Sequence, residues 1–144
     1  MADSLTLRVI TPETIALDTT TDSVQLPGVD GGMGILPKHA AMVAALGTGL
    51  VRYSAEGQDV MHAPVEQDLF VSGGFAEVRD NTVRIVTETS ERVGDIDIQR
   101  AKEAEERARK RLLERHPDLD LRRAQAALAR ALLRLRFSER MRRR

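Results

Sequence analysis

The 144-residue chain contains no cysteine, which excludes disulfide bonds and thiolate chemistry. It also has no long apolar run, because the most extended one, residues 40–51 (AAMVAALGTGLV), is weakly apolar and interrupted by glycines. A membrane-spanning helix needs about 20 consecutive apolar residues. The N-terminal MADSLTLRV lacks the basic and then apolar pattern of a signal peptide. We therefore expect a protein of a soluble, reducing compartment, with no direct membrane span.

Glycine is absent from the last third of the chain, since none follows Gly94. Charge divides the sequence at nearly the same place. Residues 1–90 contain 5 basic and 12 acidic residues, for a net charge of −7, whereas residues 91–144 contain 17 basic and 10 acidic residues, for +7. Such an asymmetry indicates two units with different partners. The predicted domains are residues 1–90 and residues 91–144.

The first domain has the alternation of apolar and polar residues that is typical of antiparallel strands with one buried face. Turn signals separate these strands at a spacing of about 8–12 residues, which predicts an antiparallel β-sandwich of about ten strands. The alternating apolar positions are Leu5, Leu7, Val9, Val24, Leu26, Val83 and Ile85. The turn signals are Pro27-Gly28, Gly31-Gly32, Gly47–Gly49, Glu56-Gly57, Gly73-Gly74 and Asp80-Asn81.

The second domain has a helical composition, so the predicted fold class is α+β, a sandwich followed by an antiparallel two-helix hairpin. Strong helix formers dominate from Ile98 to Arg115, and Asp97 can cap their first turn. Pro117 ends this helix, and Asp118 or Asp120 can cap a second one that continues to about Ser138. Narrow apolar stripes rich in alanine predict a weakly held hairpin. They comprise Ala101, Ala104, Ala108 and Leu112 in one helix and Ala124, Leu128, Ala131 and Leu135 in the other.

The stretch LPGVDGGMGILPKH at residues 26–39 raises the question of a phosphate-binding loop. Such a loop needs glycines that lead from a strand into the N-terminus of a helix. Here the glycines lead into Ile35, Leu36 and Pro37, which cannot open a helix, and no G-K-[ST] follows. The stretch is therefore interpreted as a structural turn.

No catalytic or metal-binding residues are predicted. The histidines, His39, His62 and His116, are widely separated and have no cysteine partners, unlike the closely spaced ligands of metal sites. Ser72 lies in FVSGG, which lacks the first glycine of a nucleophile elbow.

Residues 121–144 contain nine arginines and one acidic residue, a net charge of +8. An arginine-rich helix of this kind can neutralise nucleic-acid phosphates. Phe137 is the sole aromatic residue of this segment, however, and the segment contains no recognised nucleic-acid motif. Nucleic-acid binding is therefore an alternative and not the first prediction.

Several ordered motifs, spread over essentially the whole chain, resemble the epsilon subunit of the bacterial F-type ATP synthase. LPGVDGGMGILPKHA is similar to the signature turn of that family, which usually reads close to PGxxGExGILPGHA. FVSGGFAEVRDNTVRIVTETSER resembles the segment that closes its β-domain. DIDIQRAKEAEERA and RRAQAALARALLRLR resemble its two C-terminal helices.

The resemblance implies a non-catalytic rotor subunit on the cytoplasmic face of the bacterial plasma (inner) membrane, attached peripherally. Its expected partners are the gamma subunit and the c-ring, with no nucleic acid. The signature turn implies the docking residues, although Gly32 stands where the family usually has a glutamate and Lys38 where it usually has a glycine. The implied rotor-docking turn comprises Gly31, Gly32, Met33, Gly34, Pro37, Lys38 and His39.

In bacterial members of the family the helices can swing from a compact hairpin to an extended form that reaches the alpha/beta catalytic head and inhibits ATP hydrolysis. A thin alanine interface makes two such states close in energy. The resemblance thus implies an inhibitory basic helix that contains Arg122, Arg123, Arg130, Arg134, Arg136 and Arg140.

Some relatives bind ATP on the folded hairpin through an I/L-D-x-x-R-A motif and two arginines of the second helix. Residues 96–101 (IDIQRA) match that motif, and the resemblance implies a regulatory ATP site with no required cofactor and no essential Mg²⁺. The corresponding residues are Glu91, Ile96, Asp97, Arg100, Ala101, Arg130 and Arg134. The residues alone also allow an N-cap aspartate and ordinary surface arginines. A free-standing adaptor, whose basic hairpin binds nucleic acid or an acidic protein, is the alternative function.

Overall fold

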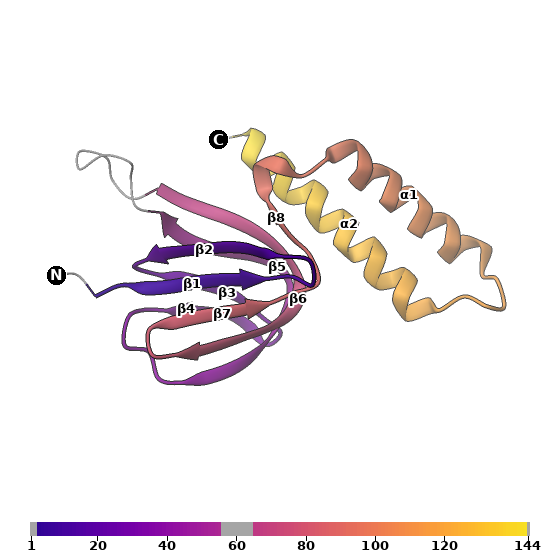
Figure 1. The fold of residues 1–144 in the computed structure, drawn as a ribbon. Coiled ribbons are helices and arrows are strands. Elements are labelled where there is room, and N and C mark those ends of the chain that lie inside the picture. The colour runs from indigo at the N-terminus through magenta and orange to yellow at the C-terminus, as the bar shows by residue number, and fades with distance from the viewer. Residues whose placement is uncertain (1–2, 56–64, 144) are drawn as a thin grey trace. The chain divides into compact units, whose positions relative to one another are not determined.

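A computed structural model describes residues 3–55 and 65–143. The predicted turn Glu56-Gly57 and His62 lie outside these residues. The chain forms two compact units, Met1–Glu91 and Arg92–Arg144, which are described separately. Figure 1 shows a strand-rich first unit and a helical second unit.

The first unit contains one mixed sheet of eight strands in its described part, and the strand order is β2-β1-β7-β6-β5-β3-β4, with β8 paired to β6 outside this path. The sequence neighbours β1–β2, β3–β4, β5–β6 and β6–β7 form antiparallel pairs, whereas β1 and β7 pair in parallel. The strands are β1 (Leu5–Ile10), β2 (Ile15–Thr21), β3 (Val24–Gly28), β4 (Gly31–Ile35), β5 (Met42–Ala55), β6 (Val65–Arg79), β7 (Thr82–Val86) and β8 (Ser90–Arg92).

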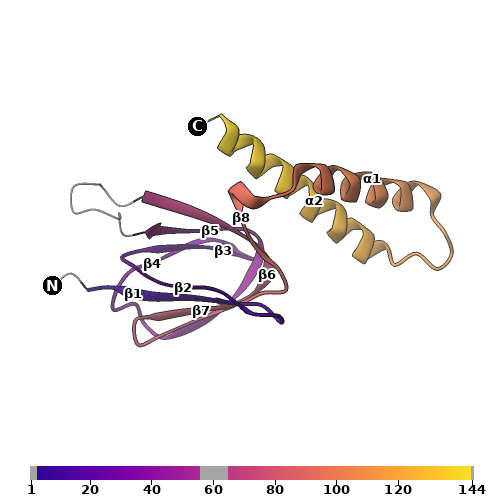
Figure 2. The ribbon, with the colours of Figure 1, turned by 45° about the horizontal axis from the view of Figure 1, so that its top comes forward.

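The sheet folds over itself because β5 and β6 bend near their middle (Figures 1 and 2). Glycines occupy the bend: the register passes from Leu46 opposite Gly74 to Thr48 opposite Ser72. Gly74 has a φ of +104°, and a Cβ atom there would lie 1.9 Å from the Val86 carbonyl oxygen. Only glycine fits this position, since both the backbone conformation and the space exclude a side chain.

The predicted fold class is confirmed, with two differences in detail. The described strands number eight where about ten were expected, because β5 and β6, at 14 and 15 residues, each continue through glycines that the sequence suggested as turns. The parallel pairing of β1 with β7 also departs from a purely antiparallel sandwich. It arises because the chain returns to its first strand after a long excursion, and pairing direction depends on that tertiary path.

The core of the sandwich lies between the two layers of the folded sheet. The alternation seen in the sequence decides which side chains enter it, and all seven alternating apolar positions are buried. Across the rim, the Thr21 and Ser54 hydroxyl oxygens are 3.0 Å apart, which links β2 to β5. The main core residues are Leu5, Leu7, Val9, Val24, Leu26, Ile35, Leu46, Val51, Tyr53, Leu69, Val71, Val78, Val83 and Ile85.

The second unit is a helical hairpin preceded by the short 3-10 turn η1 (Val93–Asp95). Its helices are α1 (Ile98–Glu114) and α2 (Leu121–Arg142). Asp97 caps α1 by accepting a hydrogen bond from the Arg100 backbone N–H at 3.0 Å, and Asp120 caps α2 in the same way at 3.1 Å. The helix α2 continues to Arg142, beyond the predicted end at Ser138, because no glycine or proline interrupts it.

Small side chains form the contact between the two helices, which pack side by side in both views of the hairpin (Figures 1 and 2). The buried residues are Ala101 and Ala108 in α1 and Ala124, Ala131 and Ser138 in α2. The larger residues of the predicted stripes, Leu112, Leu128 and Leu135, are half-buried. Apolar burial along the hairpin is therefore modest.

Candidate functional site

The predicted docking turn folds as β4 and the loop that follows it. Gly31 opens β4 with a φ of +130° and pairs with Gly28 across a two-residue turn. The glycines lead into a strand and not into a helix N-terminus, which agrees with the rejection of a phosphate loop. After Pro37 the chain reverses, and the His39 backbone N–H donates to the Leu36 carbonyl at 3.1 Å.

Lys38 adopts a left-handed backbone conformation, with a φ of 65°. Glycine reaches this conformation without steric cost, whereas a lysine pays for its Cβ atom. Two contacts hold the residue in place. Its backbone N–H donates to the Asn81 side-chain oxygen at 2.6 Å, and its Nζ lies 2.7 Å from an Asp3 carboxylate oxygen. The lysine thus keeps the backbone path that suits a glycine and adds an exposed positive charge.

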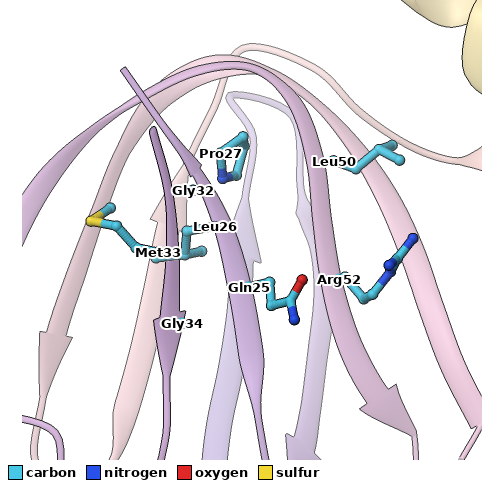
Figure 3. Close-up of a pocket in the computed structure, with 8 residues that line it drawn as sticks. All are labelled: Gln25, Leu26, Pro27, Gly32, Met33, Gly34, Leu50 and Arg52. Atoms are coloured by element: carbon cyan, nitrogen blue, oxygen red, sulfur yellow. The ribbon is translucent and has the colours of Figure 1, made fainter. Parts of the chain in front are cut away.

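A groove of about 420 Å³ lies on the outer face of β3, β4 and β5 (Figure 3). Two of its positions, Gly32 and Gly34, carry no side chain, and a Cβ atom at Gly34 would meet nothing within 4 Å. The absence of side chains along β4 therefore leaves the groove open. Its lining residues are Gln25, Leu26, Pro27, Gly32, Met33, Gly34, Leu50 and Arg52.

Arg52 borders this groove in a fixed orientation. Its Nε and Nη2 atoms donate to the two carboxylate oxygens of Asp68, at 2.7 and 3.1 Å. This hydrogen-bonded pairing raises the pKa of Arg52 above its ordinary value, although burial acts in the opposite direction. A bidentate arginine–carboxylate pair is directional as well as attractive. The groove therefore ends at a guanidinium whose charge is already largely balanced.

Exposed apolar side chains lie beside the docking turn. Val43 on β5 is 71 % exposed, and Phe75 on β6 is 47 % exposed directly opposite Ala45. Val29, in the turn between β3 and β4, is joined to the same region because its backbone N–H donates to the Ala45 carbonyl at 3.1 Å. We call Val29, Val43, Ala45 and Phe75 the apolar patch. Sequence reasoning missed both the patch and the groove, although period-two alternation along β5 would have indicated which of its residues face outward.

The residues of the predicted nucleotide motif lie at the start of α1. Ile96 and Ala101 are buried, so their side chains are not accessible to a ligand in this form. The Asp97 carboxylate is engaged as the helix cap, while the Arg100 side chain is exposed. Glu91 lies in β8, which pairs with β6, and it is the last residue of the first unit.

Arg130 and Arg134 lie on α2 and are both half-buried. Each residue advances about 1.5 Å along its helix axis, so residues equally far from the loop between the helices lie at the same height along the hairpin. Counted in this way, Arg134 lies at the height of Ala101, and Arg130 lies at the height of Glu105. Arg130 also lines a groove of about 540 Å³ that includes two other arginines near the loop. The groove residues are Arg111, Asp118, Leu119, Asp120, Arg123, Ala124, Ala127 and Arg130.

The remaining residues of the predicted basic helix point outward. Arg122, Arg123, Arg136 and Arg140 are exposed along α2. An exposed arginine face on a helix with little apolar burial suits contact with an acidic surface more than it stabilises the hairpin itself.

Residues 3–55 and 65–143 contain no group of three or more histidine, cysteine or acidic side chains that could hold a metal ion. Neither helix in this part of the chain combines the length and the apolarity that crossing a membrane requires.

Comparison with protein families gives two matches that together cover most of the chain. Residues 4–93 match the family model described as "ATP synthase, Delta/Epsilon chain, beta-sandwich domain". Residues 95–139 match "ATP synthase, Delta/Epsilon chain, long alpha-helix domain". The change between the two matches falls at the η1 turn, between the sandwich and the hairpin.

Comparison with curated proteins gives relatives named ATP synthase epsilon chain. The relative from Syntrophomonas wolfei is 42 % identical over 141 residues, which cover 97 % of this chain and 98 % of the relative. The relative from Symbiobacterium thermophilum is 44 % identical over 137 residues, covering 94 % and 93 %. The relative from Carboxydothermus hydrogenoformans is 43 % identical over 117 residues, covering 81 % and 82 %.

Solved structures agree with these relatives. A chain of the Euglena gracilis mitochondrial ATP synthase, in a structure of OSCP, F1 and c-ring, is similar with a TM-score of 0.71 and 25 % identity over 90 % of this chain and 78 % of that chain. A chain of the Tetrahymena thermophila mitochondrial ATP synthase central stalk and c-ring has a TM-score of 0.59 at 16 % identity, over 96 % and 97 %, which supports the fold alone. With both halves matched and relatives aligned over nearly their full length, this chain belongs to the ATP synthase delta/epsilon family, as an epsilon chain.

Proposed function

We propose that this chain is a non-catalytic subunit of the central stalk of a proton-translocating F-type ATP synthase, where it couples the catalytic head to the c-ring. The sandwich docks on the gamma subunit and the c-ring through the docking turn and the apolar patch. The assembly lies on the cytoplasmic face of the bacterial plasma membrane, and this chain is attached to it peripherally. The similar solved structures are assemblies of the F1 part, the central stalk and the c-ring, which supports these partners.

The apolar patch is the observation that carries this proposal. Clustered apolar side chains on the surface of a small domain mark contact sites for other proteins. Here Val29, Val43 and Phe75 are exposed on three adjacent segments, next to a turn that matches the family signature. A partner that covers them recovers the free energy of burying aliphatic and aromatic surface, about 25 cal/mol per Å².

A co-purification experiment tests the docking surface. The full chain with Val43→Asp should lose most of its retention on the gamma subunit, because the carboxylate would be buried without a partner. Val65→Asp is the matched control, since Val65 is 53 % exposed at the opposite end of the β5–β6 pair. Both variants should keep the wild-type melting temperature. Equal retention of the two variants would move the docking surface away from the patch.

The hairpin is proposed to inhibit ATP hydrolysis when its helices open and reach the alpha/beta head. Two features support this: the alanine contact between the helices is thin, and four arginines of α2 (Arg122, Arg123, Arg136 and Arg140) are exposed and available to an acidic partner. Removing residues 121–144 should therefore raise ATP hydrolysis by the assembled head and leave assembly intact. Unchanged hydrolysis would remove the inhibitory role, whereas loss of assembly would assign docking to the helices.

A regulatory ATP site on the folded hairpin is the finer part of the proposal. Arg130 and Arg134 lie at the height of the first turns of α1. Their guanidinium groups can therefore reach the phosphates of a ligand bound near Arg100. A ligand that binds only the folded hairpin stabilises it by about 2.7 kcal/mol at a hundredfold excess over its Kd. This amount is sufficient to shift a nearly balanced equilibrium towards the folded state.

Thermal melts of the full chain with and without millimolar ATP test this site. ATP should stabilise the hairpin, Arg130→Ala should abolish the effect, and addition of EDTA should leave it in place. Arg122→Ala is the matched control, because Arg122 is an exposed arginine of the same helix. A wild-type protein that does not respond to ATP would leave Asp97 as a helix cap and the arginines as charges that face the head.

A further inference from the structure

Ser138 departs from the pattern of the hairpin contact. It follows Ala124 and Ala131 at intervals of seven residues on the buried face of α2, and it is itself 5 % exposed. Its side chain differs from alanine by one hydroxyl. Within the described part of the chain, the Ser138 Oγ atom is buried and has no hydrogen-bond partner.

The hydroxyl lies at the open end of the hairpin, where α1 has not yet begun. The helix α2 contacts the η1 turn there. Met141, one turn beyond Ser138, packs near Gly94, and a Cβ atom on that glycine would lie 3.4 Å from the methionine Cε. Ser138 is therefore covered when the hairpin is folded and becomes accessible to water when α2 leaves η1 and α1.

A buried hydroxyl without a partner has lost its hydrogen bonds to water and has gained none in return. It regains them on opening. The side chain thus weakens the folded hairpin and leaves the opened form unaffected, in a contact that otherwise consists of alanine methyl groups. An alanine at the same position would keep the Cβ contact of the hairpin without this loss.

We propose that Ser138 sets the balance between the folded and the opened hairpin by destabilising the folded form. The effect of Ser138 on ATP hydrolysis rests on the proposed function, because the opened hairpin is the form assigned to inhibition. Its physical part, the effect on the opening equilibrium, is independent of that assignment.

Amide hydrogen exchange of the full chain reports the opening, because α1 is too short to remain a stable helix once it separates from α2, and its backbone N–H groups then exchange. Ser138→Ala should slow exchange in α1 by about 5- to 30-fold, the range that corresponds to one or two kcal/mol. The readout is taken on α1, where no residue is changed, so that a local gain in helix propensity within α2 does not enter it. Ala129→Ser is the matched control: Ala129 is exposed on α2, and the reverse substitution there should change α1 exchange by less than about twofold.

Two outcomes decide the proposal. Slower exchange of α1 in Ser138→Ala, with little change in Ala129→Ser, supports it. An effect of Ser138→Ala no larger than that of the control overturns it, because the hydroxyl would then cost the folded state nothing.

The rate of ATP hydrolysis by the assembled head distinguishes a failure of this inference from a failure of the proposed function. In Ser138→Ala the hairpin should open less often, so that ATP hydrolysis rises above the wild-type rate. Slower exchange with unchanged hydrolysis supports the role of Ser138 in the opening equilibrium and contradicts the inhibitory role of the opened helices.

Discussion

The sandwich and the hairpin of this chain are held together by different amounts of apolar surface. In the sandwich, large side chains such as Leu7, Val51 and Ile85 are completely buried between two layers. In the hairpin, the buried positions of the two helices are alanines and one serine. A buried valine or leucine contributes about 1.5–3 kcal/mol and an alanine much less.

This difference matches the separate tasks proposed for the two units. A docking platform has to present the apolar patch and the groove in one geometry, and a dense core between hydrogen-bonded strands provides this rigidity. A regulatory element has to exchange between two forms that lie within a few kcal/mol of each other. Alanine contacts suit the hairpin to this proposed task, while the capping aspartates Asp97 and Asp120 stabilise the first turn of each helix.

The largest expected effect concerns the bend of the sandwich. Gly74→Ala should destabilise the first unit by more than about 3 kcal/mol, because the new Cβ atom would overlap the Val86 carbonyl and the φ of +104° disfavours it further. Urea unfolding monitored by circular dichroism measures the loss. Gly34→Ala is the control, since a Cβ atom there meets open space and the strand keeps its fold. Similar losses in both variants would mean that the bend is not the cause.

The second prediction compares core with surface. Leu7→Ala should lower the free energy of unfolding of the sandwich by about 2–5 kcal/mol, through lost burial and the cavity that remains. Leu113→Ala, in the hairpin, should change stability by less than about 0.5 kcal/mol, because Leu113 is 83 % exposed. Chemical denaturation of both variants gives the two values. A large loss in Leu113→Ala would contradict the description of a weakly packed hairpin.

The third prediction sharpens the comparison within the hairpin. Asp97→Ala removes the acceptor for the Arg100 backbone N–H and should weaken α1 by about 1 kcal/mol. Hydrogen exchange should detect faster opening of both helices, while the thermal transition of the sandwich stays in place. A shift of the sandwich transition by the same amount would show that the two units unfold together.

The smallest expected effect is that of removing the hairpin. A chain that ends at Arg92 retains β8, which pairs with β6, and should melt cooperatively within a few degrees of the sandwich transition of the full chain. The expectation follows because the sandwich core is formed entirely by residues of the first unit. Calorimetry of the shortened chain provides the measurement, and an unfolded product would mean that the hairpin completes the sandwich.

Much of the fold could be predicted from local signals. Alternation marked Leu5, Leu7 and Val9 as core, because side chains of a strand point to opposite faces and the face toward the core must be apolar. An aspartate before a run of helix formers marked the start of α1, because its carboxylate satisfies a free backbone N–H.

The candidate site was predictable only in part. The sequence motif predicted a structural turn at residues 26–39, and its role in docking stays a prediction. The groove and the apolar patch combine residues of β3, β4, β5 and β6. Val43 and Phe75 come together because β5 and β6 pair along their whole length. No local pattern in the sequence specifies that register, and none indicates that Gly47 and Gly73 bend long strands where turns were expected.

The sequence by itself determined the order of a β-sandwich and a helical hairpin, the aspartate cap that begins the first helix, and the opposite charges of the two units. These properties depend on interactions between residues close together in the chain. Only the tertiary structure decided the parallel pairing of β1 with β7, the left-handed conformation of Lys38 beside Asn81, and the burial of the Ser138 hydroxyl. Each of these depends on which distant segments meet, and that is settled by packing the whole chain and not by the preference of any one residue.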